Sequence, residues 1–136
     1  MSFNIELDHI GIATKSLQDS TFFKTLGLPE AGVEEVVSEK VKVGFFETMN
    51  NAMIELLEPT AEDSPIAKFL DKRGPGIHHI CFRVQGLDDL ILHLKSNDVK
   101  FINEEPKMGA HNCRIVFIHP KSTGGVLVEL SEKGKA

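Results

Sequence analysis

The sequence of 136 residues contains no Trp and no Tyr, and its only cysteines are Cys81 and Cys113. Without Trp and Tyr, an aromatic stacking platform for single-stranded nucleic acid would have to consist of Phe alone. The formal net charge of −5 argues further against a nucleic acid partner, because phosphate binding relies on an excess of Lys and Arg. The two isolated cysteines lack the spacing of a zinc site, and they favour a reducing, cytoplasmic environment.

Long apolar runs are missing as well, so the sequence predicts no membrane-spanning helix and no membrane partner. The first residues, Met1–Glu6, lack the basic and apolar regions of a signal peptide, which again predicts a cytoplasmic protein. Hydrophobic residues make up 41% of the chain and charged residues 26%, a composition typical of folded globular proteins. The length suits one domain, and we expect residues 1–136 to form it.

An internal repeat organises the chain. Around His9, and again around His79, a short apolar strand carries a histidine near its start. The offset between the two histidines is 70 residues (79 − 9 = 70). Later in each half, at 52–56 and at 126–130, three apolar residues are followed by Glu and Leu. Each half therefore offers one His and one Glu within an apolar strand, a pattern that predicts two similar modules.

The order of the predicted elements repeats too. Apolar alternation and β-branched residues predict strands at 5–14, 33–37, 41–48 and 52–58 in the first half, and at 77–85, 99–103, 113–119 and 125–131 in the second. Helices are predicted from Ser16 to Gly27, from Pro65 in the linker 60–76, and at 87–97. Residues 49–51 predict a tight turn, and 131–136 a polar tail.

The fold class predicted from this order is α+β. Two βαβββ modules, about residues 5–59 and 77–131, would be related by pseudo-twofold symmetry and would form an open barrel-like mixed sheet around a metal cleft. By alternation, His9 and His79 face the concave side of this sheet, and the neighbouring His78 faces the other side.

A histidine or glutamate in an apolar strand has a simple structural explanation when it occurs alone. The histidine can be a hydrogen-bonded core residue, and a buried Glu55 or Glu129 can pair with Arg114 or with a lysine instead of a metal. The joint pattern, repeated in register in both halves, favours a metal site. Two imidazoles and two carboxylates form an N/O ligand set that suits divalent zinc, cobalt, nickel, manganese or iron.

The sequence resembles the vicinal oxygen chelate superfamily, which includes glyoxalases, bleomycin resistance proteins and dioxygenases, and within it the methylmalonyl-CoA epimerase family. The resemblance covers nearly the whole chain. It rests on Leu7–Ala13, Glu55–Pro59, Ser64–Leu70, Gly76–Ile80, Glu104–His111, Ile118–Ser122 and Gly125–Leu130. The first of these stretches fits much of the superfamily, whereas those from Glu104 onward are specific to the epimerase family.

The resemblance implies an enzyme that interconverts (R)- and (S)-methylmalonyl-CoA by 1,1-proton transfer through a metal-stabilised enolate. It implies an acyl-CoA substrate and one divalent ion, with Co²⁺ favoured and Zn²⁺, Ni²⁺ or Mn²⁺ as alternatives. His9, Glu55, His79 and Glu129 match the metal positions of the family, and Glu129 also matches a catalytic base. Some members have Gln where this chain has Glu55, so the site expected here is more anionic.

Epimerisation through a planar enolate needs one base on each face of the α-carbon, and the sequence leaves the second base unassigned. In at least one member of the family, this base lies on the strand before the position of Glu55. Val43 aligns with it, and a valine cannot take up a proton. Glu39 and Glu47 lie nearby, but a slip of one residue reverses the side to which a strand residue points.

Basic residues in the second half are candidates for binding the substrate carboxylate or the CoA phosphates. We name Arg114 and Lys121 for this role, and Lys107 is a further candidate, although solvated surface charge explains each of them equally well. Two other functions stay open: a glyoxalase I-type lactoylglutathione lyase, which the four ligands cannot separate from an epimerase, and a small-molecule binding protein of the same fold without catalysis, which needs no metal ligands. Whether the chain forms a homodimer is left open.

Overall fold

A computed structural model describes residues 3–134 of the chain. Over these residues the chain divides into two compact units, of which one is His9–His78 and the other joins residues 3–8 to residues 79–134. The division passes through strands β1 (Ile5–Ala13) and β5 (Gly76–Val84). The first strand of each repeat therefore contributes residues to both units.

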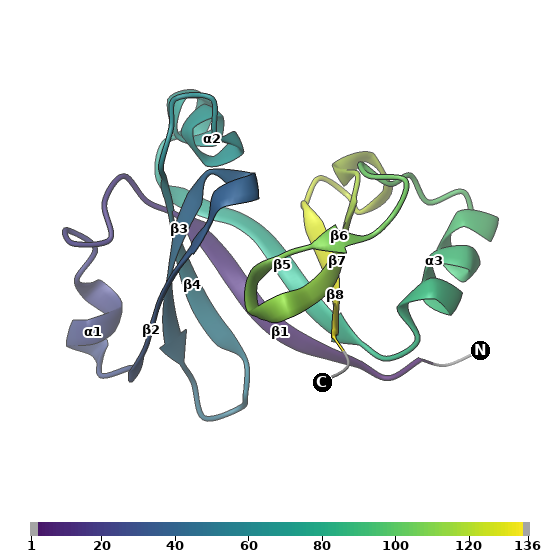
Figure 1. The fold of residues 1–136 in the computed structure, drawn as a ribbon, viewed down its shortest axis with the longest axis horizontal. Coiled ribbons are helices and arrows are strands. Elements are labelled where there is room, and N and C mark those ends of the chain that lie inside the picture. The colour runs from purple at the N-terminus through teal and green to yellow at the C-terminus, as the bar shows by residue number, and fades with distance from the viewer. Residues whose placement is uncertain (1–2, 135–136) are drawn as a thin grey trace. The chain divides into compact units, whose positions relative to one another are not determined.

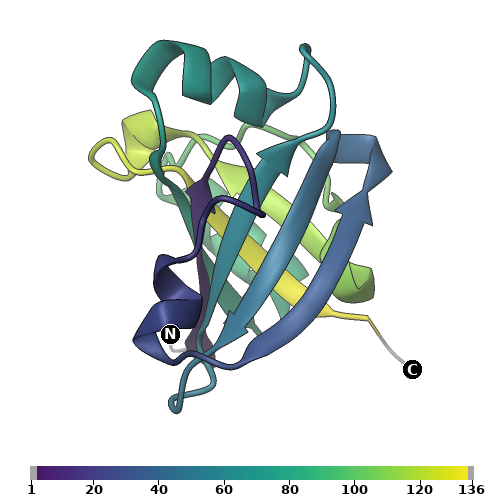
Figure 2. The same cartoon turned by 90° about the vertical axis from the view of Figure 1, so that its left-hand side faces the viewer.

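In the unit His9–His78, four strands lie in the order β2-β3-β4-β1, and Figure 2 shows β2, β3 and β4 side by side. The strands that join β1 are β2 (Glu30–Val36), β3 (Val41–Glu47) and β4 (Met53–Pro59). β3 is antiparallel to β2 and to β4, whereas β4 is parallel to β1. A short turn, η1 (Val37–Glu39), connects β2 to β3. The predicted tight turn between β3 and β4 is confirmed, with Asn51 at φ 65°, a left-handed conformation that Asn tolerates.

The helix predicted from Ser16 to Gly27 is wrong in its first half. Helix α1 covers only Phe22–Leu26, and it buries none of its residues. The apolar residues of this segment do not fall on one helical face, since Leu17 and Phe22 are five positions apart. The backbone before α1 is instead attached to the sheet, because the N–H of Leu17 donates to Glu58 Oε1 at 2.8 Å. The predicted end of the helix is confirmed, with Gly27 at φ 108°.

Helix α2 (Pro65–Arg73) begins where the sequence predicts. Ser64 is fully buried, and its hydroxyl oxygen accepts a hydrogen bond from the N–H of Ile66 at 3.1 Å. Pro65 occupies the first helical position, where a missing N–H costs no hydrogen bond. α2 packs against β4, and Figure 2 shows it across the end of the strands of this unit.

In the other unit, the strands follow the order β5-β8-β7-β6, with the first residues of β1 beside β5. The strands are β6 (Lys107–Met108), β7 (Cys113–Ile118) and β8 (Val128–Lys133), with the turns η2 (Ala110–Asn112) and η3 (Pro120–Ser122) between them. β5 is parallel to β8, whereas β7 is antiparallel to β8 and β6. Arg83 of β5 binds Glu6 and Asp8 of β1 at 2.6 and 2.9 Å.

Helix α3 (Leu87–Ser96) covers one face of the β5-β8-β7 sheet (Figure 1). The predicted inward residues Leu87, Leu90 and Ile91 are buried, and they pack with Val116 and Leu130 of the sheet. Their spacing places them on one side of a helix, as burial against a flat sheet requires.

A carboxylate from β8 caps the start of α3. Glu132 Oε2 accepts hydrogen bonds from the backbone N–H groups of Gly86 and Leu87 at 2.8 and 3.1 Å. A negative charge is favourable at this end of a helix, where N–H groups lack intrahelical partners. The sequence did not predict this cap, because Glu132 is 45 positions away from Leu87.

The strand predicted at 99–103 is also wrong. Only Phe101 forms a bridge, with Ile118, and the second strand of this module is the short β6 further along the chain. Asn103 ends the pairing, because its side-chain Oδ1 accepts the N–H of Phe117 at 2.8 Å in place of a backbone carbonyl. At the other end of the module, β8 continues to Lys133, so the tail predicted from 131 begins too early.

The element order confirms the α+β prediction and the two βαβββ modules. Over residues 3–134 the hydrogen-bonded strand order is β2-β3-β4-β1-β5-β8-β7-β6, a mixed sheet of eight strands. No helix in this range is long and apolar enough to span a membrane.

The cap of α2 gives a test of this architecture. Replacing Ser64 with Ala should lower the free energy of unfolding by about 1 kcal/mol, because the N–H of Ile66 loses its acceptor. Urea denaturation of the wild type and the variant measures the difference. Ser16→Ala is the matched control, since the Ser16 hydroxyl accepts only from Asp19 at 3.3 Å in an exposed turn. Equal losses in the two variants would contradict the assigned cap.

Candidate functional site

The unit His9–His78, here called the first unit, contains a buried His–Glu pair. The parallel pairing of β1 with β4 places Gly11 opposite Glu55, and His9 lies two residues before Gly11 on the same side of the strand. His9 and Glu55 are 7% and 6% exposed, and His9 Nδ1 lies 3.0 Å from Glu55 Oε2. The alternation predicted for β1 is confirmed, with His9, Gly11 and Ala13 buried.

The second unit contains an equivalent pair. The parallel pairing of β5 with β8 places Cys81 opposite Glu129, and His79 lies two residues before Cys81. His79 and Glu129 are 6% and 7% exposed, and His79 Nε2 lies 3.1 Å from Glu129 Oε1. Since Gly11 and Cys81 are 70 residues apart (81 − 11), the repeat seen in the sequence is preserved in the strand register.

The N–O distances of 3.0 and 3.1 Å in the two pairs are those of a hydrogen bond between an imidazole and a carboxylate. An imidazole nitrogen and a carboxylate oxygen also suit a borderline divalent metal chemically. Each pair therefore offers two of the ligands that an N/O metal site needs.

Arg114 does not serve as the partner of Glu129. Its guanidinium binds Asp88 at 2.8 Å and Glu132 at 3.1 Å, and the hydrogen bond that it donates to Asp88 is the main cause that raises the pKa of Arg114. Lys121 is exposed in η3. The predicted role of Arg114 and Lys121 in substrate binding stays a prediction.

Two of the other histidines, His78 and His119, have local structural contacts. His78 is half-buried in β5, and its ring meets the edge of Phe69 of α2 at a centroid distance of 5.0 Å. The Nδ1 atom of His119 accepts the N–H of Lys121 at 3.0 Å, so His119 stabilises the turn η3. Neither observation assigns a chemical role to these two residues.

The register of β3 shows to which side of the sheet Val43 and Glu47 point, which the sequence left open. Phe45 lies opposite Glu55, Val43 opposite Leu57, and Glu47 opposite Met53. Residues directly opposite in antiparallel strands point to the same side, so Val43 and Glu47 share the side of Glu55. Val43 is 3% exposed, whereas Glu47 is exposed at the strand end. The other candidate, Glu39, lies in the turn η1 and outside the strands.

Sequence reasoning missed one carboxylate on this side of the sheet. Glu34 of β2 lies opposite Val43, so it also points to the side of Glu55. The adjacent residues Glu34 and Glu35 must point to opposite sides of the strand, and the sequence gives no reason to choose between them. Only the register, which includes an irregularity between Glu30 and Val33, makes the choice.

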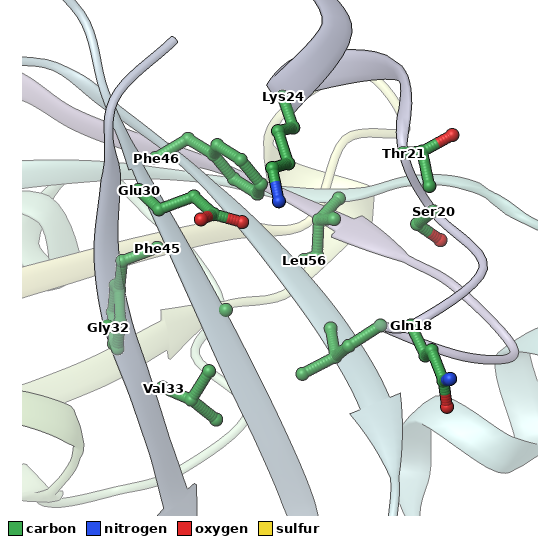
Figure 3. A pocket seen from close by; sticks show the side chains of 12 residues that line it. Gln18, Ser20, Thr21, Lys24, Glu30, Gly32, Val33, Phe45, Phe46 and Leu56 are labelled. Carbon is green, nitrogen blue, oxygen red and sulfur yellow. The ribbon is translucent and has the colours of Figure 1, made fainter.

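A separate pocket of about 410 Å³ lies on the same sheet. Gly44, Phe46 and Leu56 line it, and so does Phe45, whose position is opposite Glu55. Figure 3 shows the side chains of Lys24 from α1 and Glu30 from β2 at this pocket. Neither His9 nor Glu55 lines it, so it is distinct from the His9–Glu55 site.

Both cysteines are free thiols. Cys81 is fully buried on the same side of β5 as His79, as alternation predicts. Cys113 is half-buried at the start of β7, and burial is the main cause that raises the pKa of its thiol. A thiol with a raised pKa contains less of the reactive thiolate at neutral pH.

Comparisons with known proteins find relatives over most of the chain. The profile of the Glyoxalase/Bleomycin resistance protein/Dioxygenase superfamily matches residues 8–117. The chain is 42% identical over 135 residues to a mitochondrial methylmalonyl-CoA epimerase of Dictyostelium discoideum, covering 94% of this chain and 78% of the relative.

Two solved structures share the fold. The methylmalonyl-CoA epimerase of Mycobacterium tuberculosis has a TM-score of 0.88 at 39% identity, over 95% of this chain and 88% of its own. A variant of the Streptomyces coelicolor methylmalonyl-CoA epimerase, in complex with 2-nitronate-propionyl-CoA, has a TM-score of 0.86 at 34% identity. That comparison covers 95% of this chain and 97% of the other.

The thiols give a test of burial in the second unit. Cys113 and Cys81 should both react with an aromatic disulfide reagent far more slowly in the native protein than in urea, because one has a raised pKa and the other is inaccessible. A Cys113→Ser variant, which keeps only Cys81, should react more slowly still. Absorbance of the released thiolate follows the reaction at pH 7 to 8. Native thiols that react as fast as unfolded ones would contradict the described packing.

Proposed function

Because the chain belongs to the Glyoxalase/Bleomycin resistance protein/Dioxygenase superfamily and is an enzyme of its epimerase branch, we propose that it interconverts (R)- and (S)-methylmalonyl-CoA by a metal-dependent 1,1-proton transfer. The observation that carries the proposal is the pair of buried His–Glu contacts at equivalent positions of the repeat. The Streptomyces coelicolor relative in complex with a propionyl-CoA analogue supports an acyl-CoA as the substrate.

In this proposal, His9, Glu55, His79 and Glu129 hold one divalent ion together. The burial of both pairs and the mixed imidazole and carboxylate donors support it. When bound, such an ion acts as a Lewis acid that stabilises negative charge developing on the substrate oxygens. Co²⁺ remains the favoured ion, and Zn²⁺, Ni²⁺ and Mn²⁺ accept the same donors.

Glu129 has a second role in the proposal, as a proton carrier. The α-hydrogen of a malonyl thioester is acidified by the thioester and by the carboxylate on either side. The C–H bond breaks as an O–H bond forms on Glu129, and the electron pair is delocalised into a planar enolate. A positioned general base typically contributes ~10²–10⁴-fold to the rate of such a step.

The remaining expectations belong to the same proposal. Lys121 is exposed and available to a phosphate group of CoA, whereas Arg114 would have to exchange its bonds with Asp88 and Glu132 for a substrate carboxylate. The protein would act as one domain, in the cytoplasm, and a homodimer is compatible with every residue assigned. A lactoylglutathione lyase or a binding protein of the same fold would not need an acyl-CoA.

The assay that tests the function uses deuterated water. Protein loaded with Co²⁺ should epimerise (S)-methylmalonyl-CoA and exchange its α-hydrogen for deuterium, which mass spectrometry and chiral separation detect. Removal of the ion with a chelator should abolish both signals, and the hemithioacetal of glutathione and methylglyoxal should give no product. Turnover of the hemithioacetal without exchange of methylmalonyl-CoA would show a glyoxalase instead.

Replacing Glu129 with Gln separates its two roles. The amide oxygen of Gln can still reach a metal but cannot accept a proton, so the variant should keep bound metal. Exchange of the α-hydrogen of at least one enantiomer should fall by ~10²–10⁴-fold. Metal content by elemental analysis and deuterium uptake by mass spectrometry are measured on the same sample. Exchange of both enantiomers at the wild-type rate, with metal bound, would refute the assigned base.

A further inference from the structure

Glu34 lies on the side of the sheet that carries the His9–Glu55 pair. It is opposite Val43 of β3, and Val43 is opposite Leu57 of β4. Leu57 is two positions from Glu55 along one strand, so all these side chains point to the same side. The side of the sheet that carries the His9–Glu55 pair therefore has a second carboxylate. It lies on β2, next to Val43 of β3, the residue that aligns with a base in a member of the family.

The surroundings of Glu34 differ from those of its neighbours. Glu34 is half-buried, whereas Val33 and Glu35 on either side of it are exposed. Val43 and Phe45, which form the sheet surface next to it, are 3% and 2% exposed. A carboxylate next to buried apolar surface is partly shielded from water.

The distance from Glu34 to the His–Glu pair leaves space for a substrate. The Cα atoms of Glu34 and Glu55 are separated by two strand spacings and two residues along the strands, which gives about 12 Å. Glu34 is therefore not a direct neighbour of Glu55 in the sheet, and its carboxylate is separate from the His9–Glu55 contact.

The other carboxylates of this sheet fit the role less well. Glu35 is opposite Lys42, so it points to the other side of the sheet, and it is exposed. Glu58 is also opposite Lys42, and it accepts the N–H of Leu17. Glu47 points to the site side but is exposed at the end of β3, next to the turn.

We propose that Glu34 is the second proton carrier of the epimerisation, in addition to Glu129. This inference rests on the function proposed above. For one enantiomer, the C–H bond breaks and an O–H bond forms on one of the two carboxylates. The planar enolate then receives a proton from the other carboxylic acid on its opposite face, with formation of a new C–H bond. The two carboxylates have exchanged protonation states, and proton exchange with water restores them for the next turnover.

Glu34→Gln tests the proposal, with Glu35→Gln as the matched control one residue away on the other side of the strand. The α-hydrogen exchange of each enantiomer is measured separately in deuterated water, together with epimerisation and metal content. In Glu34→Gln, one enantiomer should keep its exchange rate, because Glu129 still removes its proton. Exchange of the other enantiomer and epimerisation should both fall by ~10²-fold or more, with metal content unchanged. Glu35→Gln should behave as the wild type.

Three results would overturn the proposal. Wild-type exchange of both enantiomers in Glu34→Gln would show that this carboxylate moves no proton. Equal loss of both exchanges would show a role in substrate binding or structure, because a single missing base affects one enantiomer. The asymmetric pattern in Glu47→Gln but not in Glu34→Gln would give the role to Glu47. A wild-type protein that exchanges neither enantiomer would instead refute the proposed function itself.

Discussion

A carboxylate that is buried in a sheet must be compensated by a positive charge, a metal or hydrogen-bond donors, because an isolated buried charge is strongly unfavourable. Glu55 and Glu129 are both subject to this requirement, at 6% and 7% exposure. In each unit the compensating group is a histidine from the neighbouring parallel strand. Arginine does not fulfil this role for Glu129, since Arg114 is bound elsewhere.

The strand pairing follows from this requirement. β1 pairs with β4, and β5 pairs with β8, so the first strand of each module lies next to its last. Parallel neighbours need a long connection, and the intervening helix and strands provide it. The register then places Gly11 opposite Glu55 and Cys81 opposite Glu129. The same parallel pairing of the first and last strand of a module therefore forms the His–Glu pair in both modules.

The sequence predicted the parts of this structure that depend on local pattern. The offset of 70 residues predicted the two modules, and alternation predicted the buried sides of β1 and β5. The cap at Ser64 and the turn at Asn51 followed from side-chain chemistry. The helix from Ser16 and the strand at 99–103 were wrong, because Glu58 and Asn103 bind the backbone of distant segments. The sequence did not single out Glu34, because the side of the sheet to which Glu34 points depends on how β2 pairs with β3. An irregularity in β2 between Glu30 and Val33 changes that pairing.

The central claim is that the two His–Glu pairs form one metal site, and metal stoichiometry tests it most directly. The wild type and the variants His9→Ala and His79→Ala are each equilibrated with Co²⁺ and analysed for bound metal per chain. The account predicts one ion per wild-type chain, and a severe loss of that ion in both single variants. Two ions per wild-type chain, with one retained in each variant, would show two separate sites and contradict the account. A wild-type chain that binds no ion would show that the pairs are hydrogen bonds alone.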